Sequence, residues 1–76
     1  MKATIANRKR LYLGLTQADM ARVMGIHYHL WVKWERNEQR ITAAPLRQIE
    51  ILTMLKDQHP AIFQKIVRKY TGTNPE

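Results

Sequence analysis

The segment covering residues 15–37 constrains the fold of this chain more than any other part of the sequence. Thr16 is a favoured residue type for the start of a helix, and Asp19 three positions later has the spacing of a capping box. Gly25 predicts a tight turn. Bulky apolar and basic residues then recur with helical spacing over about residues 28–36. Two short helices joined by a glycine turn are therefore expected here.

Such a pair of helices is the helix-turn-helix pattern, in which the second helix is shaped to lie in a DNA major groove. His27 occupies the cap position of this second helix, where Ser or Thr would be preferred. Trp31 and Trp34 are three residues apart, so we assign both to the buried face. Asn37 tolerates positive φ and is expected to end the helix.

The apolar spacing is helical throughout the chain, with no alternating strand pattern and no internal repeat. Further helices are expected over about residues 3–12, 43–56 and 60–70. For the helix at about 3–12, the positions expected to face inward are Ile5, Ala6 and Leu13. For the helix at about 43–56, they are Leu46, Ile49, Leu52 and Leu55. We predict an all-α, compact five-helix bundle as one domain over residues 1–71, with a flexible tail at 72–76.

Bulk properties exclude several classes of protein. With 76 residues the chain forms one domain at most, and its small core would gain burial from pairing with a second copy. The chain has no cysteine, and its three histidines are not spaced as metal ligands, so we expect no metal and no cofactor. No apolar run approaches the length of a membrane span and no signal peptide is evident, so a cytoplasmic location is expected. The acidic residues suggest no catalytic pair, which argues against an enzyme. The net charge of +7 favours an acidic partner such as nucleic acid.

The stretches KRLYLGLTQADMARVMGI at 9–26 and KWERNEQR at 33–40 resemble the Cro and repressor-type helix-turn-helix family, also called the XRE family. The resemblance covers about residues 5–55. It implies a lambda-repressor-like bundle whose third helix enters the major groove of double-stranded DNA. It also implies a homodimer that binds a palindromic operator and represses transcription of its own operon.

Position by position, the resemblance implies roles for individual side chains. Base edges would be read by Tyr28, His29 and Lys33, and Val32 can add contact with a thymine methyl. Phosphates would be bound by Gln17, Arg36, Asn37 and Arg40. Arg10 and Glu35 match two positions that form a buried ion pair in some members.

Each of these assignments has an alternative. In these alternatives, Tyr28 would pack against the preceding helix and His29 would be a passive surface residue. Lys33 and Arg36 would form an ordinary solvated face. The Arg10 and Glu35 side chains would simply be exposed. The chain also departs from the family in and beside the third helix, at His27, Leu30, Trp31 and Asn37. These departures are expected to change the tilt of the third helix.

The last expected helix carries an apolar stripe that is wider than one small core needs. Its members are Ile62, Phe63, Ile66, Val67 and Tyr70. We predict that this stripe forms the dimer interface, because residues before it already resemble a complete monomer core. The alternative is that the stripe only covers that core.

Three functional contexts fit the resemblance, namely a Cro-like regulator of a phage or mobile element, an antitoxin-like regulator and an anti-CRISPR-associated repressor. Two functions of other classes stay open. One is a basic protein-interaction module that binds an acidic protein partner, and the other is a nonspecific architectural DNA binder. A gel-shift assay distinguishes the regulator from these two. A regulator retains particular duplex sequences, an architectural binder retains any duplex, and an interaction module retains none at low salt.

Overall fold

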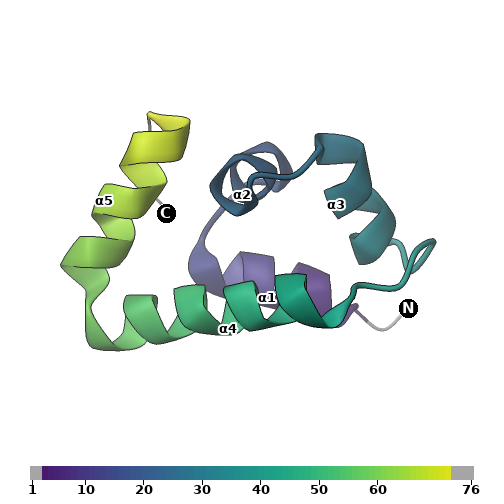
Figure 1. Cartoon of the computed structure of the whole chain (residues 1–76), viewed down its shortest axis with the longest axis horizontal. Coiled ribbons are helices and arrows are strands. Elements are labelled where there is room, and N and C mark those ends of the chain that lie inside the picture. Colours follow the sequence, from purple (N-terminus) through teal and green to yellow (C-terminus); the bar gives the residue numbers. More distant parts are fainter. Residues whose placement is uncertain (1–2, 73–76) are drawn as a thin grey trace.

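The computed structural model describes residues 3–72, which form helices and no strand. The helices are α1 (Ile5–Leu13), α2 (Gln17–Met24), α3 (Tyr28–Glu35), α4 (Ala43–Gln58) and α5 (Pro60–Thr71) (Figure 1). The all-α, five-helix prediction is confirmed, and the helix ends lie within about two residues of those expected. The predicted tail lies mostly outside the described residues.

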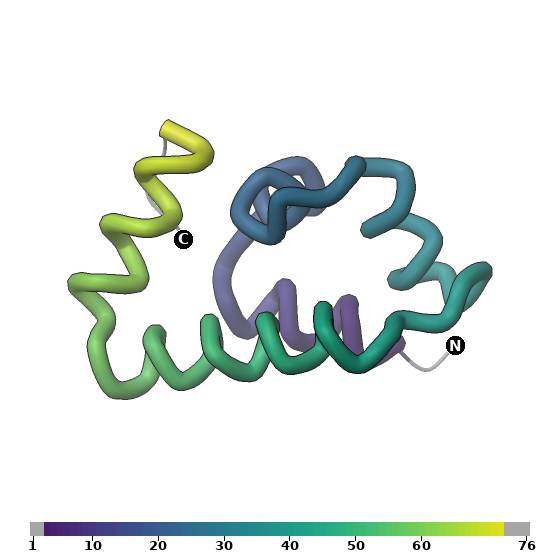
Figure 2. The backbone as a smooth tube through the Cα atoms, viewed as in Figure 1, coloured from purple at the N-terminus to yellow at the C-terminus, as the bar shows by residue number. Residues whose placement is uncertain are grey.

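The helices are arranged so that α3 and α5 lie at opposite ends of the molecule. The longest helix, α4, runs along one side next to α1, while α2 and α3 lie across from it (Figure 1). The chain turns sharply after α4, and α5 runs back to pack against α2 (Figure 2). The longest dimension of the molecule, 33 Å, therefore runs from the α5 end to the α3 end.

Local sequence signals explain the helix-turn-helix geometry. The Thr16 hydroxyl accepts a hydrogen bond from the Asp19 backbone N–H at 3.1 Å, which confirms the expected cap of α2. Gly25 ends α2 with φ 69°, a conformation that glycine adopts without steric cost. Asn37 follows α3 with φ 60°, the positive value expected for it.

The core lies where the helices meet, and the buried residues within the described range 3–72 are all apolar. Both tryptophans are buried as predicted, and Trp31 has no exposed surface. The prediction for Ile5 is wrong, since its side chain is 46% exposed. The predictions for Ala6 and Leu13 are confirmed, since both are buried, and a step of one residue, about 100° around the helix, turns Ile5 away from them. On α4, Ile49 and Leu52 are buried as expected, whereas the other two predicted positions are half-buried.

A small polar cluster joins the end of α1 to the end of α4. The Tyr12 hydroxyl donates a hydrogen bond to the Asp57 carboxylate, and the Lys56 ammonium donates to the Tyr12 carbonyl. The same ammonium lies 4.6 Å from the centre of the Tyr12 ring, within range of a cation–π contact. The hydrogen bond to Asp57 raises the pKa of Tyr12.

Candidate nucleic-acid interface

The inner face of α3 fixes the orientation of the helix. Trp31 and Trp34 pack edge to face, with ring centroids 5.8 Å apart and an interplanar angle of 76°. This is a favourable geometry for two aromatic rings. The Trp34 indole N–H is buried and has no hydrogen-bond partner among the described residues, so its side chain is held by apolar contact. Burying both indoles leaves the opposite face of α3 outward.

The outer face of α3 carries the side chains predicted to read bases. Tyr28, His29 and Lys33 are exposed, and Val32 is half-buried between them. Their spacing of one, four and five residues from Tyr28 places them on one side of the helix. A cation, an imidazole and a phenol therefore project together from the surface. These groups offer donors, an acceptor and apolar surface to a base edge.

His27 caps α3 in spite of being an unfavoured residue type there. Its Nδ1 accepts a hydrogen bond from the His29 backbone N–H at 3.3 Å. The His27 and His29 rings are stacked with centroids 5.2 Å apart, and the Tyr28 ring lies 5.6 Å from that of His29. The first turn of α3 thus carries an aromatic cluster on its exposed surface.

The starts of α2 and α3 meet through two side chains that sequence reasoning assigned to different roles. The Tyr28 hydroxyl donates to the Gln17 side-chain oxygen at 3.4 Å, although the Tyr28 side chain remains 42% exposed. Gln17 is the first residue of α2, where backbone N–H groups favour an anion. Tyr28 therefore contacts α2, as the packing alternative expected, while much of its side chain remains at the surface.

One acidic side chain lies close to the start of α2 and affects its charge. Asp19 is in the first turn of α2, and its carboxylate is 3.1 Å from the Arg22 guanidinium. An acid in the first turn repels a phosphate, but the adjacent cation offsets its charge. The start of α2 is therefore close to neutral apart from the helix dipole.

The predicted Arg10–Glu35 ion pair is present and is the centre of a larger network. The Arg10 Nε lies 2.7 Å from one Glu35 oxygen, and its Nη2 lies 3.2 Å from the other. The two side chains are only 15% and 5% exposed. The alternative in which both are exposed is therefore wrong.

Three further groups join this network, and the sequence analysis did not identify any of them. The Asn7 side-chain amide and the Trp31 indole N–H each donate to the Glu35 carboxylate. The Thr4 hydroxyl donates to the Glu35 backbone carbonyl at 3.0 Å. Asn7 lies one turn before Arg10 on α1, and Trp31 lies one turn before Glu35 on α3, so the spacing was the available signal. Together these bonds fix the end of α3 against α1.

The charge state of Glu35 follows from this environment. Burial by itself would raise the pKa of Glu35, but hydrogen bonds from Arg10, Asn7 and Trp31 outweigh it and hold the pKa below its ordinary value. Glu35 is therefore ionised at neutral pH, and its four hydrogen bonds offset the cost of burying the charge.

The predicted phosphate-binding residues after α3 lie in an exposed loop. Arg36, Asn37 and Arg40 are all solvent-exposed. The Arg36 guanidinium is 3.8 Å from the Glu38 carboxylate, and both side chains are more than half exposed. Such an exposed ion pair is weak, so the Arg36 guanidinium can readily exchange the Glu38 carboxylate for another anion. Arg40 extends the cationic surface beyond the end of α3.

The predicted dimer stripe on α5 is partly wrong. Phe63 and Val67 are 2% and 0% exposed within the single chain, so they cannot form an interface with another molecule. Ile66 is half-buried against the same core. Only Ile62 and Tyr70 are exposed, at 48% and 51%. The amphipathic pattern correctly predicted a buried face, but that face packs mainly inside the monomer.

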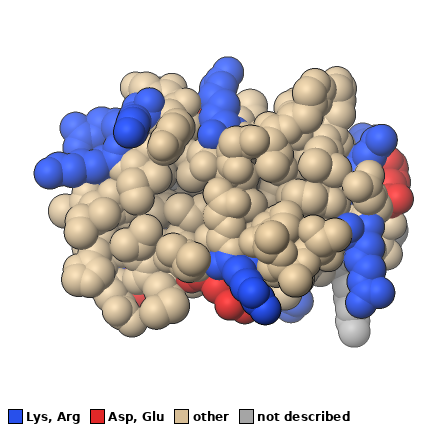
Figure 3. All heavy atoms as spheres, viewed as in Figure 1, with Lys and Arg blue, Asp and Glu red and all other residues tan. Residues whose placement is uncertain are grey.

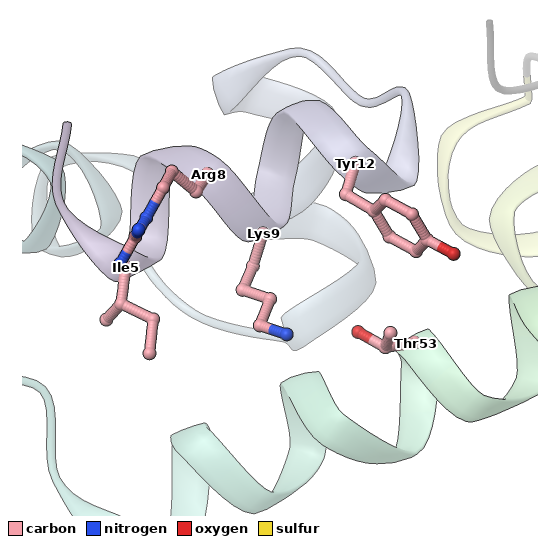
Figure 4. Close-up of a pocket in the computed structure, with 5 residues that line it drawn as sticks. All are labelled: Ile5, Arg8, Lys9, Tyr12 and Thr53. Carbon is pink, nitrogen blue, oxygen red and sulfur yellow. The ribbon is translucent and has the colours of Figure 1, made fainter.

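A separate hollow lies between α1 and α4, away from α3. It is lined by Ile5, Arg8, Lys9, Tyr12 and Thr53 (Figure 4). None of the residues predicted to contact DNA lines it. Among the described residues, no group of three or more His, Asp or Glu side chains is placed to hold a metal ion. Within the same part of the chain, no helix is long and apolar enough to cross a membrane.

No protein-family model, curated protein or solved structure matches this chain. The candidate interface therefore rests on geometry alone. It consists of the exposed face of α3, the start of α2 beside it and the basic loop that follows α3.

Proposed function

We propose that this chain is a sequence-specific DNA-binding protein that resembles Cro and repressor-type regulators, acts as a homodimer and represses its own operon in the cytoplasm. One observation carries the proposal. Trp31 and Trp34 face the core, so that Tyr28, His29 and Lys33 project together beside the start of α2. The net charge of +7 supports a polyanionic ligand.

Two classes of contact follow from this arrangement. Lys33 would donate to guanine O6 and N7 in the major groove, with His29, Tyr28 and Val32 next to it on the same face of α3. Gln17 and Arg40 lie outside that face, at the start of α2 and in the loop after α3, and would bind phosphates. In the proposed mechanism, occupancy of the operator excludes polymerase. Control then comes from the concentration of the protein, because dimerisation and DNA binding are mass-action steps.

The first test selects duplexes from genomic DNA with the purified protein and measures their retention in a gel-shift assay. We expect enrichment of a palindromic site bound more tightly than random duplex. Affinity without selectivity would replace the proposal with a nonspecific architectural binder. Absence of retention at low salt would replace it with a module that binds an acidic protein partner.

A pair of substitutions tests the division between base and phosphate contacts. Lys33→Ala should cost about 1–3 kcal/mol on the selected site and relax preference at one base pair. Arg40→Ala should weaken binding to all duplexes similarly. It should also reduce the salt dependence of the binding constant by the equivalent of about one phosphate contact. Titrations of both variants against selected and random duplex measure these effects. Equal loss of selectivity in the two variants would contradict the assigned roles.

A further inference from the structure

The outward surface of α5 carries three exposed cations, Lys65, Arg68 and Lys69, which we call the α5 cationic face. A helix turns by about 100° per residue, which places Lys65 opposite the buried Phe63 and Val67. Arg68 and Lys69 follow Lys65 by three and four residues, a spacing that makes side chains neighbours on one face of a helix. The three cations therefore lie together on the side of α5 that points away from the core.

No acidic side chain of α5 offsets the charge of this face. Residues 60–71 contain three cations and no Asp or Glu, so the helix contributes +3 to the net charge of +7. None of the three cations forms an ion pair with another residue in the described range 3–72. In Figure 3, Lys and Arg atoms gather over the end of the molecule where Figure 1 places α5, with no Asp or Glu atoms among them. The charge of the α5 cationic face is therefore available to an external anion.

The dipole of α5 does not account for the whole cluster. Cations in the last turn of a helix interact favourably with its terminal carbonyls, and Arg68 and Lys69 lie there. This effect falls off within the last turn, whereas Lys65 lies more than one turn before the end of α5. The α5 cationic face thus extends further than stabilisation of the helix requires.

The helix proposed to read DNA carries less excess charge than α5. Within α3, the cation of Lys33 is matched in number by the acid of Glu35. The loop that follows adds Arg36 and Arg40 but also Glu38. With histidine neutral, these three cations and two acids give α3 and its loop a net charge of +1, against +3 for α5. The larger cationic excess therefore lies on a surface that the base-reading role does not use.

We propose that the α5 cationic face is a second DNA-binding surface, which binds the phosphate backbone of double-stranded DNA without regard to sequence. A duplex presents phosphate charges at every base pair, so cations on one exposed face can bind neighbouring phosphates. Such contacts carry no sequence information, and they add affinity for every duplex. This inference rests on the proposed function for its choice of ligand, since DNA is the polyanion that α3 is proposed to read.

Other occupants fit the α5 cationic face less well. A protein interface has an apolar centre, but Phe63 and Val67 are buried in the core of the monomer. The exposed Ile62 and Tyr70 lie in the first and last turns of α5, so they do not form such a centre. A second copy related by a two-fold axis would bring the same three cations of both chains together, and they would repel each other.

The two proposed DNA surfaces are well separated. The α5 end and the α3 end lie at opposite ends of a molecule that is 33 Å long (Figure 1). Phosphates bound by α5 are therefore not those beside the bases that α3 contacts. Sequence-independent phosphate binding lets proteins slide along DNA, so the α5 cationic face would hold the chain on DNA while α3 samples sequences.

The decisive experiment measures how the binding constant for a random duplex depends on salt concentration. The test variant is Lys65→Gln with Arg68→Gln. The matched control is Arg8→Gln with Lys9→Gln, which also removes one Lys and one Arg, but from α1.

In the test variant, the slope of the logarithm of the binding constant against the logarithm of salt concentration should become shallower by about 1.8 for each chain bound. This value follows because each phosphate contact contributes about 0.9 to the slope. The control variant should keep the slope of the unmodified protein. Equal decreases in the two variants, or no decrease in the test variant, would overturn the inference.

A second measurement avoids substitution and so does not depend on the variants folding. In an NMR titration of the unmodified protein with random duplex, the backbone amide signals of Lys65, Arg68 and Lys69 should shift. Those of Arg8 and Lys9 should not. Shifts confined to α3 and its loop would overturn the inference. Binding to vesicles of anionic phospholipid in preference to random duplex would assign the face to a membrane surface and would also overturn it.

The same titrations separate this inference from the proposed function. The ratio of the affinities for selected and random duplex measures selectivity, which the test variant should leave unchanged because phosphate contacts carry no sequence information. A chain that binds every duplex equally, with a slope that the test variant reduces, refutes only the proposed function. A chain that selects its operator, with a slope that the test variant does not change, refutes only this inference.

Discussion

The helices at the two ends of the molecule, α3 and α5, are attached to it in different ways. The end of α3 is held by a charged network in which Glu35 receives hydrogen bonds from Arg10, Asn7 and Trp31. What α5 buries is apolar, chiefly Phe63 and Val67. Hydrogen bonds have preferred directions, whereas apolar burial does not. The helix proposed to read DNA therefore has the more closely specified orientation.

The largest effect is expected on the apolar side of this comparison. Phe63→Ala removes a fully buried ring and should cost about 3–5 kcal/mol of unfolding free energy, through lost transfer energy and the cavity left behind. Urea denaturation followed by circular dichroism measures it. Gln64→Ala, at the exposed neighbouring position, is the control and should change stability by less than about 0.5 kcal/mol. A similar small effect at Phe63 would mean that α5 is not part of the monomer core.

A somewhat smaller loss is expected from the charged network. Glu35→Gln leaves the Arg10 guanidinium without its counterion, and breaking a buried pair costs about 3–5 kcal/mol. We expect the lower end, since the amide oxygen can still accept one hydrogen bond. Glu38→Gln breaks the exposed pair with Arg36 and should cost only about 0–1 kcal/mol. Denaturant melts of both variants measure the loss of unfolding free energy. Equal losses in the two variants would mean that the Arg10–Glu35 pair is exposed.

The same network predicts how stability depends on pH. The pKa of Glu35 is lowered in the folded chain, so its contribution is present above its ordinary value of 4.5 and is lost as pH falls through the lower folded value. Melts of the unmodified protein below pH 5 should therefore show falling stability, with a shallower slope in Glu35→Gln. Parallel slopes in the two proteins would show that Glu35 carries none of the acid sensitivity. No such difference is expected for Phe63→Ala, which removes no titratable group.

The sequence specified what is local in this fold and left out what depends on tertiary contact. The ends of α2 follow from Thr16 and Gly25, whose chemistry acts within a few residues. The spacing of Asn7 and Arg10 places both on one face of α1, but their contact with Glu35 depends on how α1 and α3 pack against each other. The stripe on α5 showed that one face is buried, but the partner of that face became clear only from the burial of Phe63 and Val67.

For the candidate site, the sequence predicted the exposure of Tyr28, His29 and Lys33 because two tryptophans at helical spacing determine the opposite face. It did not predict the hydrogen bond between Tyr28 and Gln17, which depends on the angle between α2 and α3. The exposure of Met54 was also not predicted, for a different reason. The inward positions of α4 were assigned from spacing alone, and the side chains left outside were not considered.

The smallest expected effect concerns how α3 and α5 begin, since a histidine precedes each helix. His27 accepts a hydrogen bond from the His29 N–H at 3.3 Å, whereas His59 makes no side-chain cap bond before α5. His27→Ala should therefore cost about 0.5 kcal/mol, the low end for a lost cap because the bond is long. His59→Ala should change stability by less than that. Both are measured by urea denaturation followed by circular dichroism. If His27→Ala were neutral, its ring would not be a cap, and the orientation of α3 would depend only on the tryptophans and the Glu35 network.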